Sequence, residues 1–560
     1  MSIGRVLFGF GTVAVLTILA GPVAAQQGTL VGNVNDEVTG NPVPLVEILV
    51  LGGGESRTTV TNNQGQYSVQ LPAGTYDLVV SEILQYRDER FNNVGVSQGQ
   101  TTTYDLTLRV MQVQGINVTV ERSLDGQAPG DSPQTVFGVD DRDIVARATT
   151  NPSDLVSATG PVHTIKAGLQ ISHVVVRGFN NIFSGALHLL TDYRLAGVPS
   201  LRVNLMHFIP SVDEDLDRIE VVLGPSSALY GPNTANGIIH YITKSPLESQ
   251  GTTVTLGGGE RSVFQGAFRS AFLLNDDFGF KISGQYIRGD EWNYVDPTEQ
   301  AGRDAATADP AACLADKVAR GLSTADAQIA CNRLGNRSFD TERWGLEARA
   351  DYRFADDGTV VGTYGRNTSS GIELTGLGAG QTSDWVYEFF QARVRKGATF
   401  AQAYYNTSDA GDSFLLRDGV ALVDQSTLFG AQAQHGFTLA DDRQEFTLGV
   451  DYFATRPESK GTVYGSYDDD DDINEWGGYL QSRTGLSEQI DFVLAGRLDS
   501  HTLLPDNVFS TRAAFVYQPE PGHSLLHSDC PECLSRHLGG GWRGGTPGCS
   551  ATAPARMGPD

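Results

Sequence analysis

The sequence predicts a mainly β fold in three parts: a small Ig-like β-sandwich, an α+β domain, and a partial antiparallel β-barrel. Three observations support this prediction. A chain of 560 residues has room for several hydrophobic cores. Its 65 Gly and only 4 Met, with 9% aromatic residues, favour turns and strands over long helices. Long stretches of the C-terminal half alternate apolar and polar residues, which is the period of a strand.

The charge balance argues against a nucleic-acid partner. The chain has 66 Asp and Glu against 40 Lys and Arg, which gives a net charge of -26. Such a surface repels phosphates, and no basic stripe is available for a nucleic-acid groove. The glycine pattern of phosphate-binding P-loops is also absent. We therefore expect no nucleic acid and no cofactor.

Residues 1–25 have the pattern of a secretory signal peptide. Arg5 precedes an apolar run, and the small residues Val23-Ala24-Ala25 stand just before Gln26. A membrane anchor needs about 20 apolar residues, which is more than this run provides. No other stretch can cross a membrane as a helix. An exported chain of this kind is either soluble or inserted as a closed β-barrel.

Residues 26–110 predict the β-sandwich, because short alternating segments are separated by turn residues. These segments are 29–34, 43–51, 67–71, 75–81 and 104–110. The turns Asn62-Asn63-Gln64-Gly65 and Pro72-Ala73-Gly74, with Tyr67 and Tyr76, resemble the carboxypeptidase regulatory-like, transthyretin-like domain. Such domains are not peptidases. In agreement, none of the 10 His is followed by Glu three residues on.

One pattern in this part matches a catalytic motif. Gly95-Val96-Ser97-Gln98-Gly99 has the spacing of the serine nucleophile elbow of hydrolases. That motif joins a strand to a helix, and no helical pattern follows here, so we interpret the segment as a turn. No other arrangement of nucleophile, metal ligands or paired carboxylates is found, and we expect no enzymatic activity and no catalytic residue.

Residues 111–247 predict the α+β domain. The segment Ile116, Asn117, Val118, Thr119, Val120 is β-prone and is followed by polar residues with Gly and Pro. Such a tethered segment can add an edge strand to a partner's sheet through main-chain hydrogen bonds. It can equally be the first strand of the domain itself. The residues alone leave both possibilities open.

Three motifs follow in this domain. They are Arg177-Gly178-Phe179; Arg218, Ile219 and Glu220 up to Gly224-Pro225; and Tyr230-Gly231 before 237–244. Together they are similar to the plug domain of TonB-dependent outer-membrane receptors, from which Leu223, His240 and Tyr241 depart. The resemblance implies a plug inside a barrel of about 22 strands. It also makes 116–120 the candidate TonB box, the segment that a periplasmic TonB-type energy-transducing protein pulls.

The residues of these motifs also have a physical interpretation. Gly224-Pro225 and Gly231-Pro232 predict fixed turns between buried strands. Arg218 lies near Asp215, Asp217 and Glu220 in the sequence and can form ion pairs with them. A solvated, charged face explains the same residues equally well.

Residues 248–525 predict long amphipathic strands, in which apolar and charged side chains occupy opposite faces. The alternating runs include 264–272, 278–286, 344–354, 446–452 and 490–498. Runs of about ten residues with aromatic ends and charges on one face are typical of a barrel that faces lipid outside and water inside. The acidic run 468–472 is most simply a solvated loop, and a calcium site there lacks the spaced ligands of a known loop.

The number of strands limits what this barrel can enclose. We count about 12 strands, which would close with a backbone radius of about 12 Å. A plug of roughly 130 residues has an equivalent radius of about 18 Å. The sequence therefore predicts a partial barrel, about 12 of 22 strands. Its unpaired edges lead us to expect that the chain as written does not insert stably in lipid.

The five cysteines fall into two groups. Cys313 and Cys331 lie in a long loop rich in Ala and Asp, and in an oxidising compartment a disulfide is expected between them. The other three lie in residues 526–560, a Gly- and Pro-rich tail without strand or helix periodicity. There His527, Cys530, Cys533 and His537 have the spacing of a zinc site, but no supporting structure is indicated. We expect a disordered, frameshifted tail and no metal.

The function that the resemblance implies is energy-coupled uptake of a scarce ligand such as a siderophore, cobalamin or a carbohydrate. The expected location is the outer membrane, with lipid and a TonB-type protein as partners. Two alternatives remain: an exported carbohydrate-binding or adhesive β-protein, and an inactive gene fragment.

Overall fold

The computed structural model describes residues 27–36, 42–52, 55–80, 89–108, 134–157, 159–176, 186–200, 202–224, 226–232, 234–355, 358–375, 378–439, 443–462, 471–487, 489–520, 523–529 and 553–554. The chain divides into two compact units, Met1–Gly115 and Ile116–Asp560. None of the described helices is both long enough and apolar enough to cross a membrane.

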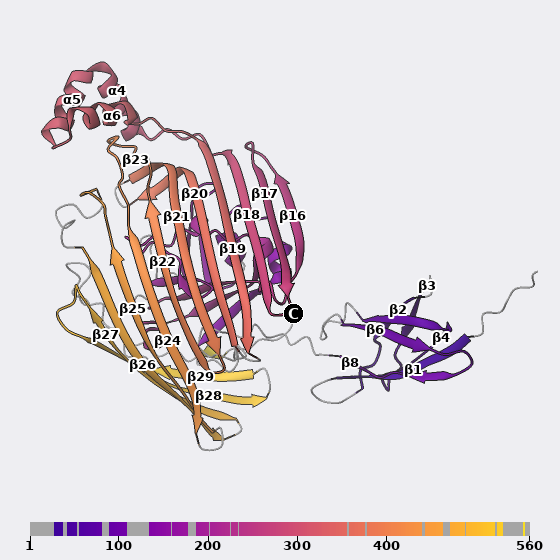
Figure 1. The fold of residues 1–560 in the computed structure, drawn as a ribbon. Helices are drawn as coiled ribbons and strands as arrows, with labels where there is room; N and C mark the ends of the chain where they lie inside the picture. Colours follow the sequence, from indigo (N-terminus) through magenta and orange to yellow (C-terminus); the bar gives the residue numbers. More distant parts are fainter. Residues whose placement is uncertain are drawn as a thin grey trace, which may run out of the picture. The chain divides into compact units, whose positions relative to one another are not determined.

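The N-terminal unit consists of two antiparallel-rich sheets (Figure 1). In one, β1 lies between β4 and β7 and also pairs with β8; the other has the order β3-β2-β5-β6. The strands are β1 (Gln27–Asp36), β2 (Glu47–Gly52), β3 (Glu55–Val60), β4 (Gln66–Pro72), β5 (Gly74–Val80), β6 (Glu89–Val96), β7 (Thr101–Thr103) and β8 (Leu106–Leu108). Alternate apolar residues such as Leu30, Ile48 and Leu78 form its buried core. The predicted sandwich is confirmed.

The sequence pattern did not predict three strands of this unit, β3, β6 and β7, because their polar residues hide the alternation. Ser97 of the hydrolase-like pattern lies directly after β6 and is followed by a turn rather than a helix. The Tyr76 hydroxyl donates to the carbonyl of Pro72 at 2.9 Å and so fixes the turn between β4 and β5.

The middle domain is built on a mixed sheet with the order β13-β12-β15-β14-β9, beside a separate hairpin of β10 and β11. Its elements are β9 (Thr135–Asp140), α1 (Asp141–Val145), α2 (Ser153–Val156), β10 (Val162–Lys166), β11 (Ser172–Val176), β12 (Leu187–Thr191), β13 (Arg194–Leu195), η2 (Met206–Phe208), η3 (Asp213–Asp215), β14 (Leu216–Leu223), α3 (Ser227–Tyr230) and β15 (Gly237–Thr243). β12 runs parallel to β15, and β14 runs antiparallel to it.

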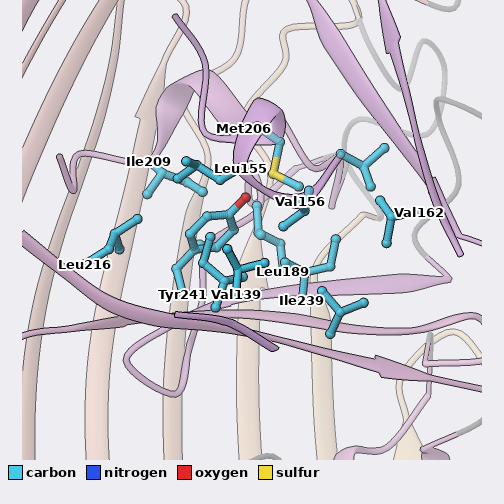
Figure 2. Packing of buried hydrophobic residues seen from close by; sticks show 14 of the residues in the cluster. Val139, Leu155, Val156, Val162, Leu189, Met206, Ile209, Leu216, Ile239 and Tyr241 are labelled. Atoms are coloured by element: carbon cyan, nitrogen blue, oxygen red, sulfur yellow. The ribbon is translucent and has the colours of Figure 1, made fainter. Parts of the chain in front are cut away.

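An apolar core holds this domain together. Figure 2 shows Leu155, Met206 and Ile209 packed over Tyr241 and Ile239 of the sheet. The Tyr241 hydroxyl, the one polar atom among these side chains, donates to the carbonyl of Pro152 at 2.9 Å. Burial of apolar side chains is the main stabilising contribution here, at about 25 cal/mol for each Å² removed from water.

The C-terminal part forms one antiparallel sheet of 15 strands, of which β23 and β30 have 2 residues each. Its strands are β16 (Gly251–Gly258), β17 (Phe264–Asn275), β18 (Phe278–Asp290), β19 (Asp340–Ala355), β20 (Gly358–Thr375), β21 (Gly378–Lys396), β22 (Thr399–Asp409), β23 (Phe414–Leu415), β24 (Thr427–Leu439), β25 (Gln444–Arg456), β26 (Ile473–Ser487), β27 (Ile490–His501), β28 (Val508–Glu520), β29 (His523–Asp529) and β30 (Ala553–Pro554). Among the described residues its path runs from β16 to β30 without closing. Figure 1 shows it curving around the middle domain.

The two faces of this sheet differ as the alternation predicts. On β19, Trp344, Tyr352 and Phe354 are exposed on the outer face. Between them in the sequence, Glu347 and Arg349 point inward and are buried beneath the middle domain. An apolar outer face and a polar inner face are the pattern of a membrane-inserted barrel. The predicted mainly β fold with a partial antiparallel barrel is therefore confirmed.

The segment expected to be a long loop between β18 and β19 is instead helical. It contains α4 (Pro297–Ala308), α5 (Pro310–Ala319) and α6 (Thr324–Arg333). Each begins with a capping side chain, since Asp296, Asp309 and Ser323 accept hydrogen bonds from the first turn. Proline follows the cap in the first two helices. Cys313 of α5 and Cys331 of α6 form a disulfide.

Candidate functional site between the middle domain and the sheet

The contact between the middle domain and the sheet is centred on a tight hairpin. Its tip, Asp192-Tyr193, joins β12 to β13, and both residues have positive φ, 46° and 72°. Two-residue turns of this kind favour Asn-Gly, because a side chain in the left-handed region costs roughly 1–2 kcal/mol. Here two non-glycine residues adopt that conformation together. The contacts of the tip must therefore compensate for this strain.

The Asp192 carboxylate lies between two arginines on the inner face of the 15-stranded sheet. We call this sheet the wall and the face that the middle domain contacts the inner wall. Arg349 of β19 and Arg393 of β21 each approach it to 3.6 Å. It also accepts hydrogen bonds from Thr243, at 3.1 Å from the backbone N–H and 2.7 Å from the hydroxyl. Although burial opposes its ionisation, Arg393 and Arg349 hold the pKa of this carboxyl below its usual value. Asp192 is therefore ionised at any physiological pH.

The residues after Asp192 extend the contact. The Tyr193 ring packs against Phe400 at 5.3 Å between ring centres, and its carbonyl accepts from Gln402 Nε2 at 2.9 Å. Arg194 is fully buried. Its Nη1 donates to the Tyr387 hydroxyl at 2.7 Å, and its guanidinium lies 3.5 Å from the centre of the Phe389 ring. Within the described part of the chain, no carboxylate pairs with Arg194.

A second contact lies at the start of β14. Asp215 is fully buried between Arg269 of β17, at 2.7 Å, and Lys281 of β18, at 2.6 Å. The cations that hold Asp192 and Asp215 thus occupy the inner faces of β17, β18, β19 and β21. We call these four residues the basic row: Arg269, Lys281, Arg349 and Arg393. Two acidic residues of the middle domain insert into this row.

The motif residues that the sequence singled out have various roles. Arg218 pairs with Asp217 at 2.6 Å and with Glu220 at 3.0 Å. The expected pairing with Asp215 is wrong, because that carboxylate faces the basic row. The alternative of a solvated face is also wrong for Asp215 and Glu220, which are fully buried; only Asp217 is half exposed.

The glycines of the motifs lie where the backbone needs them. Gly224 has φ 92° and Gly231 has φ 81°. A Cβ on Gly231 would lie 2.9 Å from Nη2 of Arg497, and Nη1 of the same side chain donates to the carbonyl of Leu229 at 3.3 Å. Ile219 belongs to the main core of the domain, and Tyr230 is buried in a separate apolar cluster that includes Tyr479 of β26. These residues therefore shape the domain and its fit against the sheet.

Several predicted residues fall outside the described part of the chain. These are Ile116 to Val120, Arg177, Gly178, Phe179, Pro225, Cys530, Cys533 and His537, together with the side chain of His527. The zinc alternative in the tail is therefore untested. Among the residues that are described, no group of three or more His, Cys, Asp or Glu is arranged to hold a metal ion.

Sequence reasoning missed the hairpin tip and the basic row as a site. The tip has a visible signal, since Asp192-Tyr193 interrupts two apolar segments, as a hairpin turn does. The alternation placed Arg349 on the inner face. Its partner could not be inferred, because Asp192 lies far away in the sequence and no local rule joins the two.

Comparison with known proteins assigns two domains. The model of the TonB-dependent Receptor Plug Domain matches residues 128–238, which include the hairpin tip and η3. The middle domain is a TonB-dependent receptor plug domain. The model of the Carboxypeptidase regulatory-like domain matches residues 29–109, so the N-terminal unit is a domain of that kind.

Relatives of the plug include transporters and receptors. A vitamin B12 transporter of Vibrio vulnificus is 27% identical over 124 residues, which cover 22% of this chain and 20% of the relative. A ferrioxamine receptor of Yersinia enterocolitica is 29% identical over 116 residues, 20% of this chain and 15% of the relative. A TonB-dependent receptor of Formosa agariphila is 27% identical over 227 residues, 38% of this chain and 20% of the relative. The chain thus spans a fifth or less of the length of these curated relatives.

Solved structures share the fold of the plug and the sheet. The siderophore receptor PirA from Pseudomonas aeruginosa has a TM-score of 0.50 and 15% identity, covering 72% of this chain and 64% of the other. A variant of the ferric enterobactin receptor PfeA from the same organism has a TM-score of 0.52 and 13% identity, covering 72% and 62%. At these identities the likeness concerns architecture.

Proposed function

We propose that this chain supplies the plug, and the wall around it, of a TonB-dependent receptor in the cell outer membrane. The receptor takes up a scarce ligand such as a siderophore, cobalamin or a carbohydrate, with energy from the inner membrane. The observation that carries this proposal is the plug docked on the charged inner face of a sheet whose outer face is apolar. Transport of this kind needs no covalent chemistry, so no enzymatic activity is proposed.

The plug contact suits a part that must move. A separate apolar part of the contact joins Phe208 and its neighbours in the plug to Trp385 and Phe389 of β21. Around Asp192 and Asp215 the contact consists of ion pairs and hydrogen bonds, such as Asp192 with Arg349 and Asp215 with Lys281. Water and other polar groups can replace such partners one by one, whereas separating an apolar interface exposes its whole area at once. A pulled plug can therefore leave the wall without losing its own core.

The energy for this movement enters through the candidate TonB box, Ile116 to Val120. We propose that this segment pairs as an added strand with a sheet of the TonB-type protein. The proposed division of the chain is a signal peptide at 1–25, the regulatory-like domain at 26–110, the plug at 111–247, the barrel strands at 248–525 and a tail at 526–560. Within the same proposal, the regulatory-like domain either spaces the plug from the TonB-type protein or binds sugar.

The test is binding of the full chain to the purified periplasmic domain of the TonB-type protein from its own cell. Val118→Pro removes a backbone N–H from the proposed strand, and we expect it to reduce co-purification at least about tenfold. Gln127→Pro, in the same tether but outside the segment, serves as the control and keeps binding. Unchanged binding of the Val118→Pro chain contradicts the TonB box. A wild-type chain that does not bind the TonB-type protein contradicts the receptor function.

A further inference from the structure

A cavity of about 270 Å³ lies between the hairpin tip and the inner wall of the sheet. Tyr193 and Leu195 line it from the plug, and Phe400 and Gln402 line it from β22. Since a water molecule occupies about 30 Å³ in the liquid, the cavity has room for about nine waters or for a small chemical group of similar volume.

The cavity lies at one end of the sheet. Its lining residues Arg353 and Thr359 flank the short turn between β19 and β20, and Arg395 and Phe400 flank the short turn between β21 and β22. The helices α4 to α6 connect strands at the opposite end, as Figure 1 shows. In outer-membrane barrels the short turns face the periplasm and the long connections face outward. A ligand reaches this cavity only after it has passed most of the plug.

The wall of the cavity carries more positive than negative charge. Its lining includes four arginines, Arg349, Arg353, Arg393 and Arg395, against the carboxylates of Asp351 and Glu248. Asp351 is already engaged, because it binds Arg349 through two contacts of 2.6 Å. Within the described residues, Arg353 makes no ion pair. The cavity therefore has one guanidinium group, that of Arg353, available for a further anion.

The plug itself supplies a counter-charge to Arg349 and Arg393, the two more buried arginines of the cavity. Asp192 neutralises Arg349 and Arg393 from a hairpin tip that is held in a strained conformation. When the plug moves, the tip relaxes, Arg393 loses the carboxylate of Asp192, and Arg349 keeps only Asp351 as its counter-charge. A buried cation without a partner is costly. Planar guanidinium groups accept a carboxylate or phosphate in two-pronged geometry, so an incoming oxyanion is the natural replacement.

We propose that this cavity is an anion-binding site on the path by which the transported ligand leaves towards the periplasm. There a carboxylate or phosphate group of the ligand replaces Asp192 on Arg349 and Arg393. The proposal rests on the proposed receptor function and adds to it the class of ligand: one that carries an oxyanion. Arg353, at the rim, attracts that group before the exchange. The hairpin tip and the ligand thus compete for the same two cations.

The proposal is tested by anion binding to the full chain in detergent, measured by calorimetry with citrate and inorganic phosphate as probes and neutral maltose as the comparison. Asp192→Asn keeps the shape of the tip but removes the competing charge, and it should tighten citrate binding about tenfold. Arg353→Gln should weaken it about tenfold. Arg261→Gln is the matched control, because Arg261 lies at the other end of the sheet over the ring of Trp292 and should leave binding unchanged.

Several outcomes overturn the proposal. They are equal binding of maltose and citrate, no anion binding by the wild-type chain, or citrate affinities of Asp192→Asn and Arg353→Gln that match the wild type. If Asp192→Asn does not fold, Arg353→Gln still decides, because Arg353 is exposed and changes no buried contact. Binding to the TonB-type protein is measured separately. A chain that binds this partner but no anion agrees with the receptor function and contradicts only the anion-binding site.

Discussion

The core of the plug and the part of its contact with the wall around Asp192 and Asp215 are built from opposite kinds of residue. The core contains buried apolar side chains such as Leu155, Met206 and Ile239. The contact contains the acidic residues Asp192 and Asp215 among arginines and a lysine. Apolar packing is lost all at once when a domain unfolds, whereas polar contacts can be exchanged singly. The difference indicates that the ion pairs around Asp192 and Asp215 can be released while the plug keeps its own core.

The largest effect should follow from a cavity in the plug core. Tyr241→Ala removes a fully buried ring and its hydrogen bond to Pro152, and we expect a loss of about 4 kcal/mol in the free energy of unfolding. Urea unfolding of the full chain, followed by protease resistance of the plug, measures it. Val145→Ala, at an exposed position of α1, should change little. A small loss for Tyr241→Ala would mean that the apolar core does not hold the plug together.

Removing the charge at the hairpin tip should loosen the contact and spare the core. Asp192→Ala removes the carboxylate that faces Arg393 and one of the two that face Arg349, which costs about 3 kcal/mol. Amide hydrogen exchange should then rise about 100-fold in residues 187–195 and stay unchanged in β15. Asp217→Ala is the control, because its half-exposed ion pair contributes little. Faster exchange throughout the plug would refute the separation of core and contact.

A smaller effect depends on pH. Burial raises the pKa of Asp213 to about 6 despite the hydrogen bond from Thr149, whereas an ordinary carboxyl titrates near 3.8. A raised pKa means that the protonated form stabilises the fold below pH 3.8 and that this contribution is lost as pH rises through 6.

The ionised Asp213 therefore costs up to about 3 kcal/mol at pH 8. Asp213→Asn resembles the protonated form, so its melting temperature should exceed that of the wild type at pH 8. The two melting temperatures should converge at about pH 4. A difference that is independent of pH would show that the substitution acts through packing and not through titration.

The smallest effect concerns the fit of the plug against β27. Gly231→Ala places a methyl group 2.9 Å from Nη2 of Arg497 and forces a positive φ on alanine, at a cost of about 1–2 kcal/mol. Amide hydrogen exchange in residues 227–231 should become faster and so measure this destabilisation. Gly362→Ala provides the control, since no atom lies within 4 Å of the Cβ position there. Equal exchange in both variants would argue against close contact at Gly231.

The sequence predicted what depends on local pattern. Alternation identified the faces of β17, β18, β19, β25 and β27, and the residues from Arg218 to Gly231 pointed to the plug. The helices α4 to α6 were missed although their caps, Asp296-Pro297 and Asp309-Pro310, are visible in the sequence. The capping signal was outweighed by the strand pattern on both sides.

The contacts of the plug could not be predicted by the same means. Arg393 donates to the carbonyl of Asp192 across 201 positions of the chain. Its geometry depends on the curvature of the sheet and on the depth at which the plug lies. A local sequence period encodes neither the curvature of the sheet nor the depth of the plug. The sequence therefore predicts charged residues on the inner face but not their partners.

The strands of the wall differ in length, and this has a consequence for its rim. β20 and β21 have 18 and 19 residues, whereas β22 has 11, although β21 and β22 meet at the same short turn. At about 3.4 Å per residue and a tilt of about 40°, eight extra residues raise one side by about 20 Å. The rim of the sheet at the end away from this turn is therefore uneven in height. Regular hydrogen-bonded strands, and not only loops, carry the helical module and the 410–426 segment that borders the entrance on its taller side.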